Sequence, residues 1–232
     1  MRSAGSDLSF VQLLHTVRTG EPAFPAQFGL SFWDDLAADP ARSASFDTQM
    51  AADVAAWAPD IVAAYDWGSL GHLVDVGGGN GALLATLLRE HPGLRGTVLD
   101  LPGAVEAARK ALTAAGLADR GDAKAGSFFD PLPPGAGGYL LCAVLHDWDD
   151  AAARAILRRC AEAAGADGRV LVVEKFATDA DGRTEMDLRV LAYFGGRERD
   201  IAELTALAAA AGLRVAAVHP AGATPVVELT AL

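Results

Sequence analysis

The spacing of apolar side chains divides the chain near residue 70. Over residues 1–70 they recur at helical spacing, as in Phe46, Met50, Val54 and Trp57 at i, i+4, i+8 and i+11. Over residues 71–232, short apolar runs of strand length alternate with helical patterns. The pattern therefore predicts a helical extension over 1–70 and a larger α/β domain over 71–232. Because so short an extension cannot bury its own aromatic side chains well, we expect it to pack on the main domain, on a partner, or on both.

The α/β domain is predicted to hold a doubly wound, seven-stranded, mostly parallel sheet that ends in an antiparallel hairpin. Apolar runs place the strands at 73–76, 97–100, 122–126, 139–145, 170–174, 214–219 and 225–229. A helix is expected over 103–115, where a glycine followed by an apolar residue signals its end. Asp200 and Glu203 have the spacing of a capping box, whereas Asp39-Pro40 predicts a turn in the extension.

The most informative stretch runs from Leu73 to Gly81, with four glycines in its last five positions. Glycine lets a ligand approach the backbone closely, and the start of the following helix offers free N–H groups. Asp100 ends the next strand, 23 residues after Gly77, where a carboxylate can bind ribose hydroxyls. The spacing suits S-adenosylmethionine (SAM), but Gly77, Gly79 and Ala82 also satisfy the dinucleotide fingerprint. A glycine turn without a ligand is the third interpretation.

Titratable side chains follow the fourth and fifth predicted strands. His146 and Asp147 come directly after the fourth strand, and Glu174 ends the fifth. Because the carboxyl ends of parallel strands share one edge, we expect these groups beside the glycine turn. A histidine there can act as a general base, and Glu174 and Glu198 could orient it and stabilise its cation. Glu198 also has an ordinary interpretation, a surface ion pair with the arginine at 197 or 199.

Composition narrows the classes of function. The net charge of −11 argues against a nucleic-acid partner, because phosphate binding needs a basic surface. Two cysteines are typical of a protein in a reducing compartment, and the histidines and cysteines show no metal-ligand spacing, so no metal is expected. The sequence lacks a membrane-length apolar run, a signal-peptide core and a Gly-x-Ser-x-Gly motif. These features predict a cytoplasmic protein without a membrane or nucleic-acid partner.

Five motifs in order resemble those of the SAM-dependent O-methyltransferases typified by plant caffeic-acid and bacterial polyketide (anthracycline-type) enzymes. They are Leu73-Val-Asp-Val-Gly-Gly-Gly-Asn-Gly81, Leu99-Asp-Leu-Pro102, Gly126-Ser-Phe-Phe129, Val144-Leu-His-Asp-Trp148 and Gly195-Gly-Arg-Glu-Arg199. The resemblance extends from about residue 8 to the end of the chain. It implies a Rossmann-like class I methyltransferase fold with SAM as the cofactor. His-Asp-Trp together with Gly-Gly-Arg-Glu-Arg carries the specificity of the match.

The resemblance also implies roles for individual residues. The catalytic group would be His146, which takes a proton from a substrate hydroxyl, with Glu174, Glu198 and Asp147 around it. The cofactor-binding residues would be Asp75, Gly77, Gly78, Gly79, Gly81, Asp100, Leu101, Ser127, Phe128, Cys142 and Trp148. The acceptor pocket would include Phe46, Met50, Met186 and Tyr193. Two positions depart from the family pattern: Ser127 stands where many relatives carry an acid, and Cys142 where plant relatives carry lysine.

The implied reaction is methylation of a phenolic hydroxyl on an aromatic, polyketide-like secondary metabolite. Relatives begin with a winged-helix dimerisation domain of roughly a hundred residues, and we expect this chain to lack it. We therefore expect either a homodimer or pairing with a full-length relative. Two alternatives share the fold: a SAM-binding member that hydroxylates or decarboxylates, and a non-catalytic SAM-binding subunit. A NAD dehydrogenase is the weakest interpretation, because the second half of the chain matches none of that class.

Overall fold

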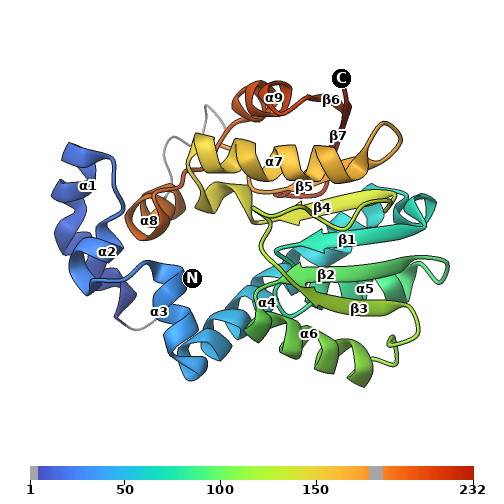
Figure 1. Cartoon of the computed structure of the whole chain (residues 1–232), viewed down its shortest axis with the longest axis horizontal. Coiled ribbons are helices and arrows are strands. Elements are labelled where there is room, and N and C mark those ends of the chain that lie inside the picture. Colours follow the sequence, from blue (N-terminus) through green and yellow to red (C-terminus); the bar gives the residue numbers. More distant parts are fainter. Residues whose placement is uncertain (1–4, 178–184) are drawn as a thin grey trace.

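A computed structural model describes residues 5–177 and 185–232 and shows one sheet with helices on both faces (Figure 1). Its strands are β1 (His72–Val76), β2 (Arg95–Asp100), β3 (Gly121–Ala125), β4 (Gly138–Cys142), β5 (Arg169–Val173), β6 (Leu213–His219) and β7 (Val226–Ala231). They lie in the order β3-β2-β1-β4-β5-β7-β6. Strands β1 to β5 pair in parallel, whereas β7 pairs antiparallel with β5 and β6. The predicted fold class, with its terminal hairpin, is confirmed.

The helices of the described residues fall into two groups. Those before the sheet are η1 (Ser6–Gln12), α1 (Leu13–Thr19), α2 (Ala23–Phe28), α3 (Phe32–Ala38), α4 (Pro40–Ala64) and η2 (Trp67–Leu70). Those within the α/β domain are α5 (Ala82–Glu90), α6 (Pro102–Ala114), η3 (Leu145–Asp147), α7 (Asp150–Ala164), α8 (Glu185–Phe194) and α9 (Ile201–Ala210). None of the described helices is both long and apolar enough to cross a membrane.

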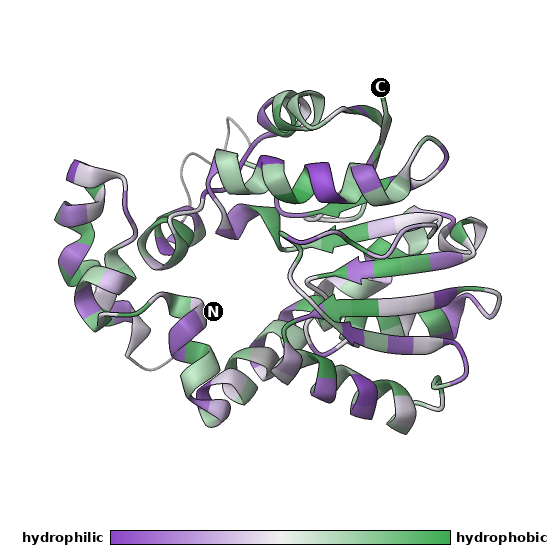
Figure 2. Cartoon of the chain, viewed as in Figure 1, coloured by the Kyte–Doolittle hydropathy of each residue, from purple (hydrophilic) through white to green (hydrophobic). Residues whose placement is uncertain are grey.

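Two apolar layers enclose the sheet because successive strand residues point to opposite faces. In β4, Leu141 packs on the side of α7 and α9, while Leu140 packs on the side of α4, α5 and α6. The alternation repeats in β5, where Leu171 and Val172 belong to opposite layers. The central strands are accordingly mostly apolar along their length (Figure 2). Burial on both faces explains why these strands read as continuous apolar runs in the sequence.

Two local predictions about helix ends can be compared with the structure. The capping box of α9 is confirmed: Asp200 accepts from the Glu203 N–H at 2.7 Å, and Glu203 accepts from the Asp200 N–H at 3.0 Å. The predicted turn at Asp39-Pro40 coincides with the junction of two helices, because α3 ends at Ala38, Asp39 is extended and α4 begins at Pro40. Asp39 also caps α4 by accepting from two backbone N–H groups of its first turn. Proline is well suited to that first turn, where no N–H is required.

The fourth strand ends earlier than predicted. The apolar run predicted a strand over 139–145, but β4 stops at Cys142. Ala143 has φ of 54°, a left-handed conformation that is unusual for a residue with a Cβ and that ends the ladder. The chain then enters the short helix η3, which carries His146. Apolarity continues through this turn because Val144 and Leu145 are buried, so the pattern alone gave no sign of the break.

The first three α-helices pack on α8 rather than forming a core of their own. Phe24 and Phe32 are buried together with Tyr193, and the rings of Phe32 and Tyr193 stack at 5.7 Å. A polar contact joins the same elements: the Asp7 carboxylate accepts from the Arg189 guanidinium and the Tyr193 hydroxyl, each at 2.6 Å. The expected packing of the extension on the main domain is therefore present. The boundary near residue 70 stays a prediction.

We expect Phe32→Ala to lower the free energy of unfolding by about 3–5 kcal/mol, because truncating a buried ring leaves a cavity in the cluster. Phe28→Ala is the matched control in the neighbouring helix, since Phe28 is 40% exposed. Urea unfolding followed by tryptophan fluorescence measures both variants. Equal losses in the two variants would contradict the packing described here.

Candidate active site

The residues predicted to bind a cofactor gather at the carboxyl ends of the parallel strands. The glycine turn follows β1, Asp100 ends β2, and Ser127 and Phe128 follow β3. Cys142 ends β4, and His146, Asp147 and Trp148 lie in and after the turn that follows it. Glu174 comes directly after β5. In an open α/β sheet this edge is where ligands bind, so the topology brings together groups that are up to a hundred residues apart.

Asp100 is held against the glycine turn by two backbone N–H groups. Its Oδ2 accepts from Gly79 at 2.8 Å and its Oδ1 accepts from Leu101 at 2.6 Å. Each carboxylate oxygen has further lone-pair capacity, so hydroxyl donors can still bind to it. Burial raises the pKa of Asp100, while the two N–H donors act in the opposite direction. Leu101 is half exposed beside it and offers an apolar contact.

Asp75 lies beneath the glycine turn and is almost fully buried. Its Oδ2 has no hydrogen-bond partner among the described residues. Burial, together with the nearby Asp100 charge, raises the pKa of Asp75 to about 7. A Cβ at Gly78 would collide with this carboxyl group, whereas a Cβ at Gly79 would meet open space. The turn is therefore closely packed underneath and open above, which is the form expected of a cradle for a ligand.

Aromatic rings form one wall of this edge. Phe128, Phe129 and Trp148 contact one another at centroid distances of 4.9 to 5.7 Å. A Cβ at Gly77 would approach Val144 to 2.9 Å and Phe128 to 3.5 Å, so this glycine permits the wall to stand close to the turn. Trp33 of the extension lies nearly parallel to Trp148, with 6.5 Å between centroids. The extension thus continues the aromatic wall.

The turn that carries His146 is organised by one carboxylate oxygen. Glu174 Oε1 accepts the backbone N–H groups of Val144, Leu145 and His146 at 3.1, 2.5 and 3.1 Å. Successive N–H groups converging on an anion form a backbone nest. The same oxygen lies 3.6 Å from Nδ1 of His146. Glu174 therefore positions the backbone of the turn as well as facing the imidazole, and only the second role followed from the sequence.

Three carboxylates determine the charge of His146. Burial lowers the pKa of His146, but Asp147, Glu174 and Glu198 together raise it to about 9. The Asp147 carboxyl is the nearest to Nε2, at 3.3 Å. Burial in turn raises the pKa of Asp147 to about 7, with Glu174 contributing in the same direction and His146 opposing it. The His146 side chain is 21% exposed to solvent, so a ligand can reach it.

Glu198 lies in the segment between α8 and α9 and is only 7% exposed. Its backbone N–H donates to the buried Asp187 of α8 at 2.9 Å. The neighbouring Arg197 and Arg199 both bond to Asp150. The interpretation of Glu198 as a surface ion-pair partner is therefore wrong, because its side chain is buried. Its charge acts on His146 across the site.

The residues predicted to line an acceptor pocket divide into two kinds. Phe46 and Met50 are half-buried on α4, and Met186 is half-buried at the start of α8. Phe46 packs against Phe32 and Trp33 of the extension. Tyr193 is different: it is 1% exposed and its hydroxyl contacts Asp7 and Arg189. Tyr193 therefore has a packing role, and its contact with an acceptor stays a prediction.

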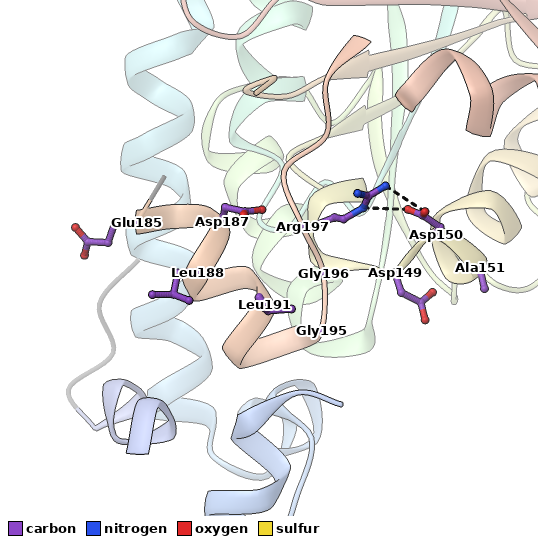
Figure 3. Close-up of a pocket in the computed structure, with 10 residues that line it drawn as sticks. All are labelled: Asp149, Asp150, Ala151, Glu185, Asp187, Leu188, Leu191, Gly195, Gly196 and Arg197. Atoms are coloured by element: carbon purple, nitrogen blue, oxygen red, sulfur yellow. Dashed lines mark hydrogen bonds and ion pairs between the residues drawn. The ribbon is translucent and has the colours of Figure 1, made fainter. Parts of the chain in front are cut away.

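A cavity of about 940 Å³ lies beside the segment that carries Gly195, Gly196 and Arg197 (Figure 3). It is lined by Asp149, Asp150, Ala151, Glu185, Asp187, Leu188, Leu191, Gly195, Gly196 and Arg197. No residue predicted for the cofactor or the base lines it, whereas Asp187, Leu188 and Leu191 lie in the stretch 186–194, which the resemblance also associates with the acceptor pocket. We place the candidate active site at the sheet edge, because the titratable and glycine residues converge there.

Some residues of the site were not found from the sequence. Trp33 extends the aromatic wall, Arg199 contacts the turn of His146, and Asp187 holds the backbone of Glu198. Arg199 lies in a motif that the resemblance had marked, so its position was signalled although its role was not. Trp33 and Asp187 had no local signal. Within 5–177 and 185–232, no three His, Cys, Asp or Glu side chains group in a way that could hold a metal ion.

The mostly parallel sheet, its antiparallel terminal hairpin and its glycine-lined edge are shared with the class I SAM-dependent methyltransferases, the class of its structural neighbours. The sequence profile of the O-methyltransferase domain matches residues 10–214, and this chain belongs to that family. It is 58% identical to a 2,7-dihydroxy-5-methyl-1-naphthoate 7-O-methyltransferase of Streptomyces carzinostaticus, over 97% of this chain and 68% of that protein. It is 44% identical to aclacinomycin 10-hydroxylase RdmB of Streptomyces purpurascens, over 94% of this chain and 60% of that protein. The predicted family is confirmed.

Solved structures agree with the fold. An O-methyltransferase from neocarzinostatin biosynthesis, crystallised with SAM and 2-hydroxy-5-methyl naphthoic acid, superposes with a TM-score of 0.94. It is 57% identical, and the match covers 98% of this chain and 69% of that one. The chain thus spans about two thirds of the length of the relatives it matches. SAM, the cofactor predicted from the sequence, is the one bound by this relative.

We expect Gly78→Ala to destabilise the protein by about 1–3 kcal/mol, because the added methyl group collides with the buried Asp75 carboxyl. Gly93→Ala is the matched control, since a Cβ there meets nothing within 4 Å. Thermal unfolding of the two variants beside the wild type measures the difference. A Gly78→Ala variant as stable as the control would show that the turn is not packed on Asp75.

Proposed function

We propose that this chain is a SAM-dependent O-methyltransferase that methylates a phenolic hydroxyl of an aromatic acceptor. The observation that carries the proposal is the position of His146. Its imidazole lies at the same sheet edge as the Asp100 carboxylate and the glycine turn, surrounded by three carboxylates. The naphthoate O-methyltransferase at 58% identity supports the assignment of the acceptor class.

The residues present fit SAM. Asp100 would hold the ribose hydroxyls, because its carboxylate is fixed by two N–H groups and remains able to accept. Asp75 would contribute from beneath the turn, because its buried carboxyl group packs against Gly78 and supports the backbone that faces the cofactor. Leu101, Ser127, Phe128, Cys142 and Trp148 would surround the remaining part together with Gly77, Gly79 and Gly81. When bound, SAM supplies the electrophilic methyl group.

His146 would act as the general base. A neutral imidazole accepts the proton of the acceptor hydroxyl and becomes a cation, which Asp147, Glu174 and Glu198 stabilise. The proton therefore moves from a hydroxyl oxygen to a nitrogen that lies among carboxylates. Glu174 fixes the turn, so the orientation of the imidazole is set before the acceptor binds. The hydroxyl oxygen is left as a phenolate, the form that attacks a methyl group.

The acceptor would lie against the aromatic side chains between the sheet edge and the extension. Phe46, Met50 and Met186 are the proposed contacts, and Trp33 and Trp148 supply flat faces nearby. Such faces favour planar aromatic molecules, and they tolerate the cationic sulfonium that the acceptor must meet.

The predicted homodimer, or pairing with a full-length relative, remains part of the proposal. The large apolar side chains of Leu8, Val11, Leu14 and Val17 are between 56% and 73% exposed at a spacing of three residues. A partner surface that covers this stripe would remove it from water. The cytoplasmic location is likewise proposed from the sequence.

His146→Gln and Asp100→Ala test the two halves of the proposal separately. We expect His146→Gln to lower turnover of a naphthoate acceptor by about a hundredfold or more while leaving affinity for S-adenosylhomocysteine unchanged. Asp100→Ala should weaken that affinity at least about tenfold. Calorimetric titration and product analysis measure the pair. Product formed without an equal amount of S-adenosylhomocysteine would indicate hydroxylation, the activity named for the 44% identical relative.

Turnover should rise steeply with pH. His146 must be neutral to accept a proton, and with a pKa of about 9 it is only about 1% neutral at pH 7. At saturating SAM and acceptor, we expect kcat to increase about tenfold for each pH unit from 7 towards 9 and then to level. A profile that levels below pH 7 would contradict the carboxylate environment described for His146.

A further inference from the structure

Two side chains of opposite charge, Glu174 and Arg199, bind the backbone of the turn that carries His146. Glu174 accepts the N–H groups at its start. On the other side, Arg199 donates to its carbonyl groups: Nη1 to Leu145 O at 2.8 Å and Nη2 to Trp148 O at 2.7 Å. These two carbonyls flank His146 and Asp147. The guanidinium thus closes the turn around the base and its neighbouring carboxyl group.

Arg199 is itself held rigidly. Its side chain is 3% exposed, and its Nε and Nη2 donate to Asp150 Oδ1 at 3.1 and 2.9 Å. A planar guanidinium presents its donors in a fixed fork, which lets one side chain bind two carbonyls and a carboxylate together. A lysine ammonium has a single nitrogen and cannot span these acceptors in the same way.

The backbone of the segment 195–200, which carries Arg199, packs closely against the turn of His146. Gly196 is buried, and a Cβ there would collide with the carbonyl oxygen of His146 and the backbone of Asp147. Between Gly196 and Arg199 lies Glu198, whose charge raises the pKa of His146. One short segment therefore supplies a close backbone contact, a carboxylate and a guanidinium to the turn of the base.

Arg197 offers a contrast within the same segment. It pairs with Asp150 at 3.1 Å and with Glu203 at 2.9 Å, and its side chain is 32% exposed (Figure 3). Within the described part of the chain, its hydrogen bonds go to Asp150 and Glu203, and none reaches the carbonyl groups of the turn. The two arginines thus share Asp150, but only Arg199 bonds to the backbone around His146.

We propose that Arg199 is a positioning residue for the base: its guanidinium fixes the turn from Leu145 to Trp148 and so holds the imidazole of His146 among its carboxylates. This inference rests on the proposed function, in which His146 takes the proton. Arg199 is not among the residues proposed to contact the acceptor or the cofactor. It acts through the geometry of the turn, together with Glu174 on the opposite side.

The positioning has an electrostatic consequence. The charged groups that face His146 are Asp147 of its own turn, Glu174 after β5, and Glu198, whose backbone is held by Asp187 of α8. The attraction between imidazolium and carboxylate weakens as the separation grows. A loosened turn therefore lets His146 move away from these groups, and its pKa falls towards the ordinary value for histidine.

Arg199→Lys tests the proposal without requiring knowledge of the acceptor. The full chain is labelled with 15N-histidine, and the five imidazoles are titrated by NMR, with His146 assigned from its absence in His146→Gln. We expect His146 to titrate at least about one pH unit lower in Arg199→Lys than in the wild type, and at the wild-type pH in Arg197→Lys. With a naphthoate acceptor at about pH 10, where His146 is mostly neutral in both proteins, kcat should fall about 10- to 100-fold while affinity for S-adenosylhomocysteine is unchanged.

An unshifted His146 titration in folded Arg199→Lys, or an equal shift in Arg197→Lys, would overturn the proposal. If Arg199→Lys does not fold, Asp150→Asn replaces it, because Asp150 is exposed yet holds Nε and Nη2 of Arg199. We expect the His146 titration in Asp150→Asn to shift in the same direction by a smaller amount, and an unshifted titration would contradict the positioning role of Arg199. If the His146 titration shifts in Arg199→Lys but the wild-type protein transfers no methyl group, the positioning role of Arg199 is supported and the proposed function is rejected.

Discussion

The site depends on a buried carboxylate that accepts hydrogen bonds from three backbone N–H groups and also faces the imidazole of His146. Glu174 stands at the end of a central strand, where the sheet leaves no water to solvate it. Three successive N–H groups of the next turn converge on one of its oxygens, and this satisfies donors and acceptor at once. The short strand β4, the left-handed Ala143 and the helix η3 are all consequences, because the chain must bend sharply to present those N–H groups.

That arrangement also explains how a base can be surrounded by acids. In a mobile loop, the distances between the imidazole and the carboxylates would change continually, and the pKa values of these groups would change with them. Here a carboxylate fixes the N–H side of the turn and a guanidinium fixes its carbonyl side. The balance between burial and charge at His146 is consequently a property of the fold and not of local sequence alone.

Much of the architecture could be predicted because it depends on local patterns. Alternating strands and helices, the glycine turn and the acid after the second strand all lie in short, readable segments. The sheet edge then followed from topology, since parallel strands end on the same side. Long-range polar contacts could not be predicted in this way: Arg199 and Leu145 are 54 residues apart, and an arginine carries no sign of which carbonyl it binds. Ala143 illustrates the same limit, because a left-handed alanine has none of the sequence signal of glycine. The burial of Tyr193 in the cluster with Phe24 and Phe32 could not be predicted either, because it depends on helices more than 150 residues earlier in the chain.

The packing of the first helices against α8 affects the order in which the chain can fold during translation. Asp7 meets Arg189 and Tyr193 across 182 and 186 residues, and the buried cluster around Phe24 and Phe32 has Ala192 and Tyr193 as its partners. During synthesis, this early segment emerges from the ribosome long before the residues that cover its aromatic rings. The cluster can therefore close only after strands β1 to β5 have been translated, and loop closure over such a distance comes late in folding. Until then, the nascent chain presents exposed phenylalanine side chains, a natural point of engagement for chaperones.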